Sequence, residues 1–304
     1  MLPMLKAKGI ALLIAEHRLH YLTELMDRLI FLEAGKIDRA FSREEFLSLS
    51  EDELADMGLR SREKPVLRLP AWKNEGELTV ETLCCPFRRD EELKLSQVSF
   101  SFGKIYGIIG ENGCGKSTLL RAMTGLDTPK KCCITLKGRA LSARERISRS
   151  ALVMQDVNSQ LFTDSVEEEL LLAWKGRYRR EKTAGEMREK AAEEAAQREI
   201  ENLLQALGLA ECKERHPMSL SGGQKQRLAL ATCLLQDANF FYFDEPTSGM
   251  DRKNMLRIAA LLQQQQREDR ILFVVSHDTA FLQEVATECL DLETFRKRKA
   301  VSRK

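Results

Sequence analysis

The sequence predicts an α/β fold built around a mostly parallel β-sheet. The first observation is that four short apolar segments, each bounded by turn or helix signals, have the pattern of buried strands. The second is that helical patterns lie between them, and strands that alternate with helices favour a parallel sheet covered on both faces. The predicted strands are Ile105–Ile109, Ala151–Met154, Asn239–Phe243 and Ile271–Val275. The predicted helices are Lys116–Thr124, Ser165–Trp174, Gly185–Leu207, Gly222–Gln236, Asn254–Gln265 and Thr279–Thr287.

Composition is that of an ordinary soluble globular protein. The 304 residues are 43% hydrophobic and 31% charged, which allows a core of normal size. The net charge of +2 gives no electrostatic reason to expect nucleic acid as the main partner. The apolar run Gly9–Ala15 is far shorter than the roughly 20 residues that cross a bilayer, and no signal-peptide cleavage site follows it. We therefore expect a chain that stays in the cytosol.

The eight cysteines fit the same compartment. Cys84–Cys85 and Cys132–Cys133 are adjacent pairs, and none of the eight has the C-x2-C spacing of a zinc site. We expect reduced thiols with structural roles.

A glycine-rich motif follows the first predicted strand and opens a helix. Its sequence, G-x-x-x-x-G-K-S, lets backbone N–H groups approach phosphates, and the helix N-terminus adds its positive end. Lys116 is predicted to hold the β- and γ-phosphates and Ser117 to bind Mg²⁺. By itself the motif indicates a P-loop NTPase, a class that includes kinases and GTPases. Its residues are Gly110, Glu111, Asn112, Gly113, Cys114, Gly115, Lys116 and Ser117, and Thr118 follows them as a further candidate for nucleotide contact.

Two acidic residues end the third predicted strand. Open parallel sheets bind ligands at the carboxyl ends of their strands, and Asp244 comes directly after an apolar aromatic run. Asp244 is predicted to hold Mg²⁺, directly or through water. Glu245 is predicted to act as the general base that polarises the attacking water. Because this base must be ionised at pH 7, its pKa does not need to be raised far.

The segment Leu220-Ser-Gly-Gly-Gln-Lys-Gln-Arg227 resembles the signature motif of ABC ATPases. The resemblance implies a P-loop NTPase with a mostly parallel sheet, a helical signature subdomain and an antiparallel β subdomain. It implies ATP and Mg²⁺ as cofactors, and a signature that closes over ATP held by a second ATPase domain. That second domain is another copy of the chain, a paralogue or a missing first half. The signature residues carried over are Ser221, Gly222, Gly223 and Gln224.

Other positions match the same family in order. Gln155 resembles the Q-loop glutamine, which implies contact with Mg²⁺ or the attacking water. Asp251 lies in a segment that resembles the D-loop, with Met250 where leucine is commoner. His277 resembles the switch histidine that contacts the γ-phosphate. Phe87 is the candidate for stacking on adenine, although Phe100, Phe102 and Phe87 itself could equally be core residues.

The stretch from Gln155 to Glu169 resembles energy-coupling factor (ECF) transporter ATPases, which serve uptake of vitamins and of cobalt or nickel. The resemblance implies a peripheral location at the cytoplasmic face of the cell membrane. It also implies a transmembrane coupling subunit and a substrate-binding membrane subunit as partners. One alternative is a soluble ABC ATPase that acts on ribosomes or DNA, but neither a coiled-coil or zinc insertion nor a long charged linker is present. Another is an inactive remnant that binds ATP without hydrolysing it alone.

The first residues repeat the end of the chain. An offset of 260 (277 − 17) aligns His17 with His277, Leu32 with Leu292 and Glu33 with Glu293. Ile10–Ala15 and Leu29–Leu32 are predicted strands on either side of a helix, with a turn at Gly35. We expect residues 1–60 to be the C-terminal remnant of a first ABC ATPase domain, 61–77 a linker, 78–293 a complete ATPase domain and 294–304 a basic, solvated tail that could touch anionic lipid.

Overall fold

The computed structural model describes residues 2–17, 19–33, 35–63, 65–88, 91–178 and 186–298. It divides the chain into two compact units, one of Met1–Val66 with Gly249–Leu256 and one of Leu67–Ser248 with Arg257–Lys304. Each unit is described by itself.

Among its described residues, the first unit contains two strands, three short helices and the start of α9 (Arg252–Gln264). Strands β1 (Arg28–Glu33) and β2 (Lys36–Ser42) pair antiparallel, and α1 (Leu2–Ala7), α2 (Arg43–Ser48) and α3 (Glu51–Asp56) complete it. Both α2 and α3 begin with capping boxes, Ser42 with Glu45 and Ser50 with Glu53, which satisfy backbone donors at the helix starts. Its small core is formed by Leu19, Phe46 and Leu54 with partly buried neighbours.

Two contacts explain why Gly249–Leu256 belongs to this unit. The Gly58 carbonyl accepts a hydrogen bond from Arg252 N at 3.1 Å. The buried Arg60 side chain donates from Nη2 to the Met250 carbonyl at 2.9 Å. The Gly249–Leu256 segment therefore packs with residues that lie about 190 positions earlier in the sequence.

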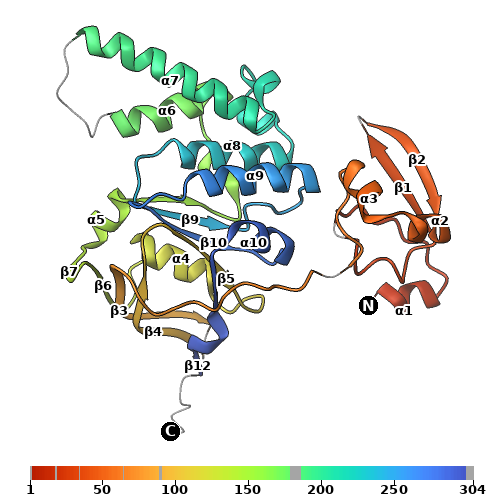
Figure 1. Cartoon of the computed structure of the whole chain (residues 1–304), viewed down its shortest axis with the longest axis horizontal. Helices are drawn as coiled ribbons and strands as arrows, with labels where there is room; N and C mark the ends of the chain where they lie inside the picture. The colour runs from red at the N-terminus through yellow and green to blue at the C-terminus, as the bar shows by residue number, and fades with distance from the viewer. Residues whose placement is uncertain are drawn as a thin grey trace. The chain divides into compact units, whose positions relative to one another are not determined.

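The second unit is built on a five-stranded parallel sheet (Figure 1). The strand order is β11-β5-β10-β9-β8. Strands β9 and β10 are buried at every residue, which explains their uninterrupted apolar sequences. The register pairs Val275 with Asp244, so the residues that follow β9 and β10 meet at one edge of the sheet. The strands are β5 (Lys104–Ile109), β8 (Ser150–Val153), β9 (Phe240–Asp244), β10 (Ile271–Val275) and β11 (Glu288–Asp291).

A second, antiparallel sheet has the order β12-β4-β3-β6-β7. Its strands are β3 (Leu78–Arg88), β4 (Glu91–Phe100), β6 (Lys131–Leu136), β7 (Arg139–Ala140) and β12 (Arg296–Arg298). The start of the expected basic tail is therefore not frayed, because Arg296–Arg298 pair with Leu93–Glu91 of β4. The rest of that tail, residues 299–304, lies outside the described residues.

Helices cover both faces of the parallel sheet, as the alternating pattern predicts. Figure 1 shows α4 between the parallel sheet and the antiparallel sheet, with α8 on the opposite face of the parallel sheet. The α-helices of this part of the chain are α4 (Lys116–Thr124), α5 (Ala143–Ser148), α6 (Val166–Tyr178), α7 (Glu186–Ala206), α8 (Gly222–Leu234), α9 (Arg252–Gln264) and α10 (Thr279–Val285). Short 3₁₀ turns are η1 (Val157–Gln160), η3 (Ala210–Cys212), η4 (Pro217–Ser219) and η5 (Leu292–Phe295).

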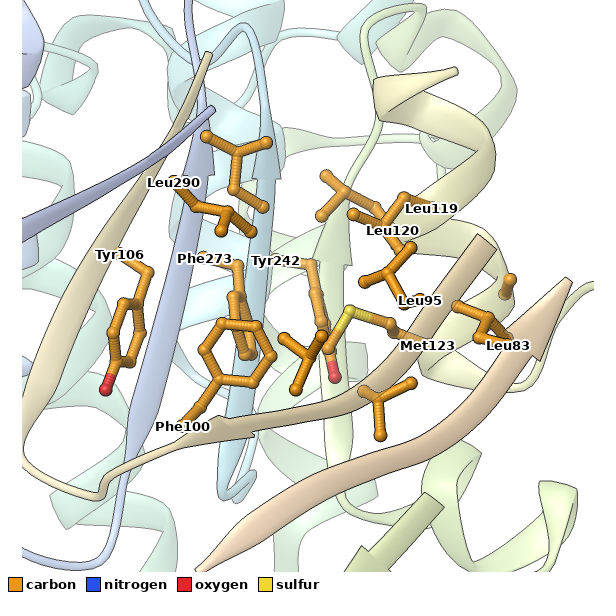
Figure 2. Packing of buried hydrophobic residues seen from close by; sticks show 14 of the residues in the cluster. Leu83, Leu95, Phe100, Tyr106, Leu119, Leu120, Met123, Tyr242, Phe273 and Leu290 are labelled. Carbon is orange, nitrogen blue, oxygen red and sulfur yellow. The ribbon is translucent and has the colours of Figure 1, made fainter. Parts of the chain in front are cut away.

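The main core lies between the two sheets and α4. Figure 2 shows Leu83, Leu95 and Phe100 of the antiparallel sheet facing Leu119, Leu120 and Met123 of α4 and the rings of Tyr242 and Phe273. Tyr242 stacks on Phe273 at 5.0 Å, and Phe100 meets Phe273 edge-on at 4.9 Å. This packing fixes α4, and with it the loop before it, against the ends of β9 and β10.

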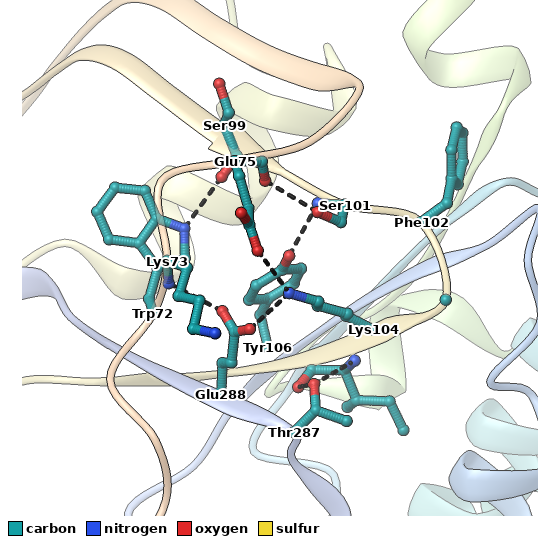
Figure 3. A network of polar contacts seen from close by, with 12 residues as sticks. Trp72, Lys73, Glu75, Ser99, Ser101, Phe102, Lys104, Tyr106, Thr287 and Glu288 are labelled. Atoms are coloured by element: carbon teal, nitrogen blue, oxygen red, sulfur yellow. Dashed lines mark hydrogen bonds and ion pairs between the residues drawn. The ribbon is translucent and has the colours of Figure 1, made fainter.

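An extended strap, Pro70–Trp72, lies along β11. Cys289 N donates to the Pro70 carbonyl, and Trp72 N donates to the Cys289 carbonyl, both at 2.9 Å. Figure 3 shows the polar network beneath it, in which Glu288 accepts from Lys104 Nζ at 2.6 Å and from Lys73 N at 2.9 Å. The strap thus adds hydrogen bonds to the exposed edge of the parallel sheet.

The predicted fold class is confirmed, and the main helix and strand predictions differ from the structure by a few residues at their ends. Two expectations in the first unit were wrong. Residues 10–15 form no strand, and turns rather than a helix follow His17. A strand requires a paired neighbour, and in the second unit the equivalent β10 lies between β5 and β9.

The structure also bears on the expected thiols and on membrane-spanning helices. All eight cysteines are free thiols, as expected. Within the described ranges, no helix combines the length and apolar character that crossing a bilayer requires.

Candidate functional site

The glycine-rich loop joins β5 to α4, as predicted. Gly110, Gly113 and Gly115 all have positive φ values (153°, 76° and 100°), which side chains other than glycine rarely adopt. Lys116, at the first position of α4, is buried and folds back over the loop, donating from Nζ to the carbonyls of Gly110 (2.8 Å) and Glu111 (2.9 Å). The loop is therefore a cradle of backbone N–H groups with one lysine at its centre.

Leu93 and Phe87 pack closely against the glycine-rich loop at Gly115. A Cβ atom added to Gly115 would lie 2.8 Å from Leu93 Cδ1 and 3.1 Å from the Phe87 ring. Phe87 therefore packs against the phosphate loop and, partly buried, against the main core. Of the other two aromatic candidates, Phe100 is fully buried and Phe102 stacks on Phe240, so both contribute to the core.

Three predicted magnesium ligands line one pocket. The pocket has a volume of about 270 Å³, and Ser117, Gln155 and Asp244 are among its lining residues. The Ser117 hydroxyl hydrogen-bonds the Asp244 carboxylate. Burial raises the pKa of Asp244, while that hydrogen bond and the Lys116 charge lower it. The sheet and α4 thus bring together oxygen donors from three segments far apart in the sequence.

Glu245 has an unusual backbone for its residue type. Its φ is +53°, in the left-handed region, and its N–H donates to the Val275 carbonyl at 2.9 Å. Its carboxylate accepts from His277 N at 3.0 Å and from the Ser276 hydroxyl at 3.3 Å. The His277 Nε2 atom lies 3.6 Å from Glu245 Oε1. The structure thus places the predicted base and the predicted switch histidine side by side.

The pKa of Glu245 is raised further than sequence reasoning foresaw. Burial raises it to about 7, and the Asp244 charge adds to the rise, while the His277 N–H, Ser276 and Lys116 oppose it. A carboxyl group with that pKa is both basic enough to attract a proton and substantially ionised near neutral pH.

The signature residues form an exposed helix start. Ser221 caps α8 in a capping box with Gln224, since Gln224 N donates to Ser221 Oγ at 3.3 Å and Ser221 N donates to Gln224 Oε1 at 2.9 Å. A Cβ on Gly222 would meet no atom within 4 Å. Gly222, Gly223, Ser221 and Gln224 do not line the pocket described above. They present an open helix N-terminus, a position that favours anions.

Asp251 is found in the first unit. It accepts from Asn254 N at 2.7 Å and from Asn254 Nδ2 at 2.9 Å, and so supports the first turn of α9. Its role toward nucleotide stays a prediction.

Sequence reasoning missed three polar contributors to the site. Gln226 of α8 donates to the Glu245 carbonyl at 3.4 Å, Ser276 contacts the Glu245 carboxylate, and Glu293 accepts from the N–H of Glu111 at 3.1 Å. Gln226 lies within the signature segment, Ser276 directly precedes His277, and Glu293 is matched by Glu33 in the repeat. These three relationships were the sequence signals that could have pointed to Gln226, Ser276 and Glu293.

The arrangement fits ATP with Mg²⁺. Hydroxyl, carboxylate and amide oxygens are the donors that Mg²⁺ prefers, and Ser117, Asp244 and Gln155 supply one of each. The adjoining loop has the glycine geometry and the buried lysine that a polyphosphate requires.

Known proteins resemble this chain along most of its length. Two putative ABC transporter ATP-binding proteins of Treponema denticola are 36% and 35% identical to it over 297 and 300 residues, which is 95% and 96% of this chain. The matches cover 57% and 58% of those relatives, so the chain spans little more than half their length. A putative HMP/thiamine import ATP-binding protein of Bacillus subtilis is 31% identical over 222 residues, 71% of this chain and 38% of the relative.

Solved structures share the fold. The ATP-binding subunit of an ABC transporter superposes with a TM-score of 0.56 at 21% identity, covering 71% of this chain and 85% of that one. The cbiO1 protein of Clostridium perfringens, part of the ABC transporter complex cbiONQ, gives a TM-score of 0.51 at 25% identity, covering 67% of this chain and 80% of that one. The family model described as ABC transporter matches residues 93–248. With the phosphate loop, the acidic strand end and the signature helix all inside that range, the chain belongs to the ABC transporter family of ATP-binding proteins.

Proposed function

We propose that this chain binds MgATP in the phosphate loop and hydrolyses it with Glu245 as general base. The observation that carries the proposal is the strained backbone of Glu245 at the end of β9, with its carboxylate held by His277 and Ser276. Strain of this kind persists where the surrounding structure over-determines a residue, and it gathers at functional sites.

The residues divide the chemistry between them. The N–H groups of the loop and Lys116 hold the β- and γ-phosphates, and Phe87 is proposed to stack on adenine. Ser117, Asp244 and Gln155 hold Mg²⁺, which neutralises phosphate charge when bound. Glu245 takes a proton from the attacking water. The His277 side chain, whose Nε2 lies 3.6 Å from Glu245 Oε1, is proposed to contact the γ-phosphate.

Hydrolysis is proposed to need a second ATPase domain. The open start of α8, with Ser221 and the two glycines, lies outside the pocket of its own chain and is suited to a phosphate held by another domain. Asp251 is proposed to contribute at the same interface.

We further propose that the hydrolysis powers uptake through a membrane, of the ECF type, with a vitamin or metal ion as cargo. The similarity to the putative HMP/thiamine import protein of Bacillus subtilis and to cbiO1 of the cbiONQ complex supports this, as does the ECF-like segment after Gln155. The partners would be a transmembrane coupling subunit and a substrate-binding membrane subunit, and the chain would act at the cytoplasmic face.

Residues 1–60 are proposed to be the C-terminal part of another ATPase domain. The repeat with His277 supports this, and so do the exposed apolar side chains of the region: Leu13 is 96% exposed, Leu32 64% and Ile37 66%. Leu292, the repeat partner of Leu32, is fully buried in the second unit. Side chains that are core in one copy and exposed in the other are expected where a copy lacks its neighbours.

The test is the ATPase turnover of the purified chain beside Glu245→Gln, over a range of protein concentrations. Turnover that rises faster than linearly with concentration, and is lost in the variant, supports a self-associating ATPase with Glu245 as base. Tight MgATP binding without turnover places the second catalytic face on another chain and supports the binding-only alternative. No MgATP binding at all would overturn the proposal.

Magnesium binding has its own test. Asp244→Asn should abolish the strengthening of ATP binding by Mg²⁺, whereas the exposed control Asp269→Asn should leave it intact. An unchanged Mg²⁺ dependence in Asp244→Asn would remove Asp244 from the ligand set.

A further inference from the structure

Glu293 lies in an unexpected place for an acidic residue. It is in η5, just after β11, and its Oε1 atom accepts a hydrogen bond from the backbone N–H of Glu111 at 3.1 Å. Glu111 is the second residue of the phosphate loop. A carboxylate beside a loop that receives polyphosphate is electrostatically unfavourable for the ligand, so its presence there calls for a structural reason.

The Glu293 side chain is fixed at both of its oxygen atoms. While Oε1 accepts from the loop, Oε2 accepts from Arg296 Nη1 at 3.1 Å. Its own backbone is set by Asp291, whose carboxylate accepts from Glu293 N at 3.0 Å. The side chain is 31% exposed, so the bonds it makes to the loop and to Arg296 are partly shielded from water.

Arg296 ties this carboxylate to the antiparallel sheet. Its Nη2 atom donates to Glu91 Oε1 at 2.8 Å, and its backbone belongs to β12, which pairs with β4 opposite Leu93. Leu93 is also the residue that would collide with a Cβ on Gly115. The loop is therefore supported at Gly115 by an apolar contact from Leu93 of the antiparallel sheet, and at Glu111 by a polar contact from Glu293, which Arg296 ties to the same sheet.

The contact with Glu293 also engages one backbone donor of the loop, the N–H of Glu111. The N–H of Glu111 donates to Glu293 of η5 and is therefore not available to the ligand, which must bind to other N–H groups of the loop and of the start of α4. A loop anchored at its entrance loses less conformational freedom when it closes around a phosphate.

We propose that Glu293, held by Arg296, is a positioning residue that pre-orders the phosphate loop for nucleotide by accepting the N–H of Glu111. It acts through the loop backbone and touches neither phosphate nor metal. The inference rests on the proposed ATP site.

The experiment compares the nucleotide affinities of two variants, which separate a role in ordering the loop from an effect of charge alone. Glu293→Ala removes both the negative charge and the acceptor, whereas Glu293→Gln removes the charge and keeps an acceptor oxygen. If Glu293 acted only through its charge, both variants would bind nucleotide more tightly than the wild type. If it orders the loop, Glu293→Ala should bind MgADP and MgATP about fivefold to tenfold more weakly, the size of a typical lost hydrogen bond. Glu293→Gln should stay close to the wild type or bind more tightly.

Dissociation constants for MgADP and MgATP would be measured by calorimetry on the full chain. Arg296→Ala should weaken both nucleotides in the same way, and Glu268→Ala, an exposed carboxylate in the turn before β10, serves as the control for net charge. In turnover assays the loss in Glu293→Ala should appear in KM, with kcat nearly unchanged, because the bound loop has the same geometry once nucleotide closes it. Thermal unfolding without nucleotide checks that the variants are folded.

Unchanged or tighter binding by Glu293→Ala would overturn the proposal, and so would equal weakening by Glu293→Ala and Glu293→Gln. A loss confined to kcat would overturn it too. Were the wild type to bind no nucleotide, the proposed function itself would fail, an outcome that differs from every result expected of the variants.

Discussion

The backbone N–H of His277 donates to Oε1 of Glu245 at 3.0 Å, while the imidazole Nε2 of the same residue lies 3.6 Å from that oxygen. One residue therefore contacts the proposed base twice: through its backbone N–H, which substitution by alanine keeps, and through its imidazole, which substitution by alanine removes. The two contacts can be separated by experiment.

His277→Ala should lower ATP turnover by about 100-fold, within the range of a lost acid–base contribution. MgADP binding should be nearly unchanged, because the imidazole is proposed to contact the γ-phosphate, which MgADP lacks, and the backbone contact that holds Glu245 survives. Single-turnover kinetics and a binding titration on the same preparation check this. Wild-type turnover in the variant would show that the imidazole has no part in the reaction.

Gly115→Ala should weaken nucleotide binding by about tenfold or more, because a new Cβ would displace Leu93 and Phe87 beneath the loop. Gly138→Ala is the matched control: its φ is +78°, but a Cβ there meets no atom within 4 Å. Both variants carry backbone strain, and only the first has the collision. Equal binding losses in a fluorescent-nucleotide titration would attribute the effect to strain alone.

Glu288→Ala should destabilise the chain by about 1–3 kcal/mol, since it leaves Lys104 Nζ and Lys73 N without their carboxylate acceptor. Glu75→Ala removes the other carboxylate near Lys104, at 3.5 Å and 61% exposed, and should cost less than about 1 kcal/mol. Urea unfolding of the three proteins measures the difference. A similar loss of unfolding free energy in both variants would mean that the burial of Glu288 does not strengthen its contribution to stability.

Lowering the pH should remove the contribution that the Glu145 carboxylate makes to folding stability. Its hydrogen bonds with Ser142 at the start of α5, and the Arg139 ion pair, lower the pKa of this carboxyl from 4.5 to about 2. Because the folded-state pKa is the lower one, the stabilisation is fully present above 4.5 and is lost as pH falls toward 2. The stability gap between wild type and Glu145→Gln should therefore close over that interval. A gap that stays constant with pH would contradict the shift.

The helices and strands of the second unit could be predicted closely, because its sequence motifs and its buried apolar runs indicate the same elements. Lys116–Thr124 and Ile271–Val275 occur with the predicted bounds, since a glycine loop starts the helix and an unbroken apolar run fills the centre of a parallel sheet. Asp244, Ser117 and Gln155 could be expected to meet, because each lies at the carboxyl end of a strand of that sheet or in the segment that follows it.

The first unit could not be predicted in the same way. Residues 10–15 have the composition of a buried strand, but no described strand pairs with them, and pairing decides whether a strand forms. The contact from Glu293 to Glu111 was also beyond the sequence, because it depends on where η5 lies against the phosphate loop. Its only trace was the alignment of Glu293 with Glu33.

The left-handed backbone conformation of Glu245 is expected to lower the thermal stability of the protein, whereas the glutamate side chain at this position is proposed to be needed for hydrolysis. Among the described residues, the others besides glycine with positive φ are Gln97 (56°), which lies within β4, and Lys137 (50°), which lies in the turn between β6 and β7. Glycine or asparagine at position 245 would relax the same backbone, so each is expected to raise resistance to heat while removing the base. A library of variants selected for survival of heating alone should therefore drift away from glutamate at this position, whereas selection for turnover should keep it.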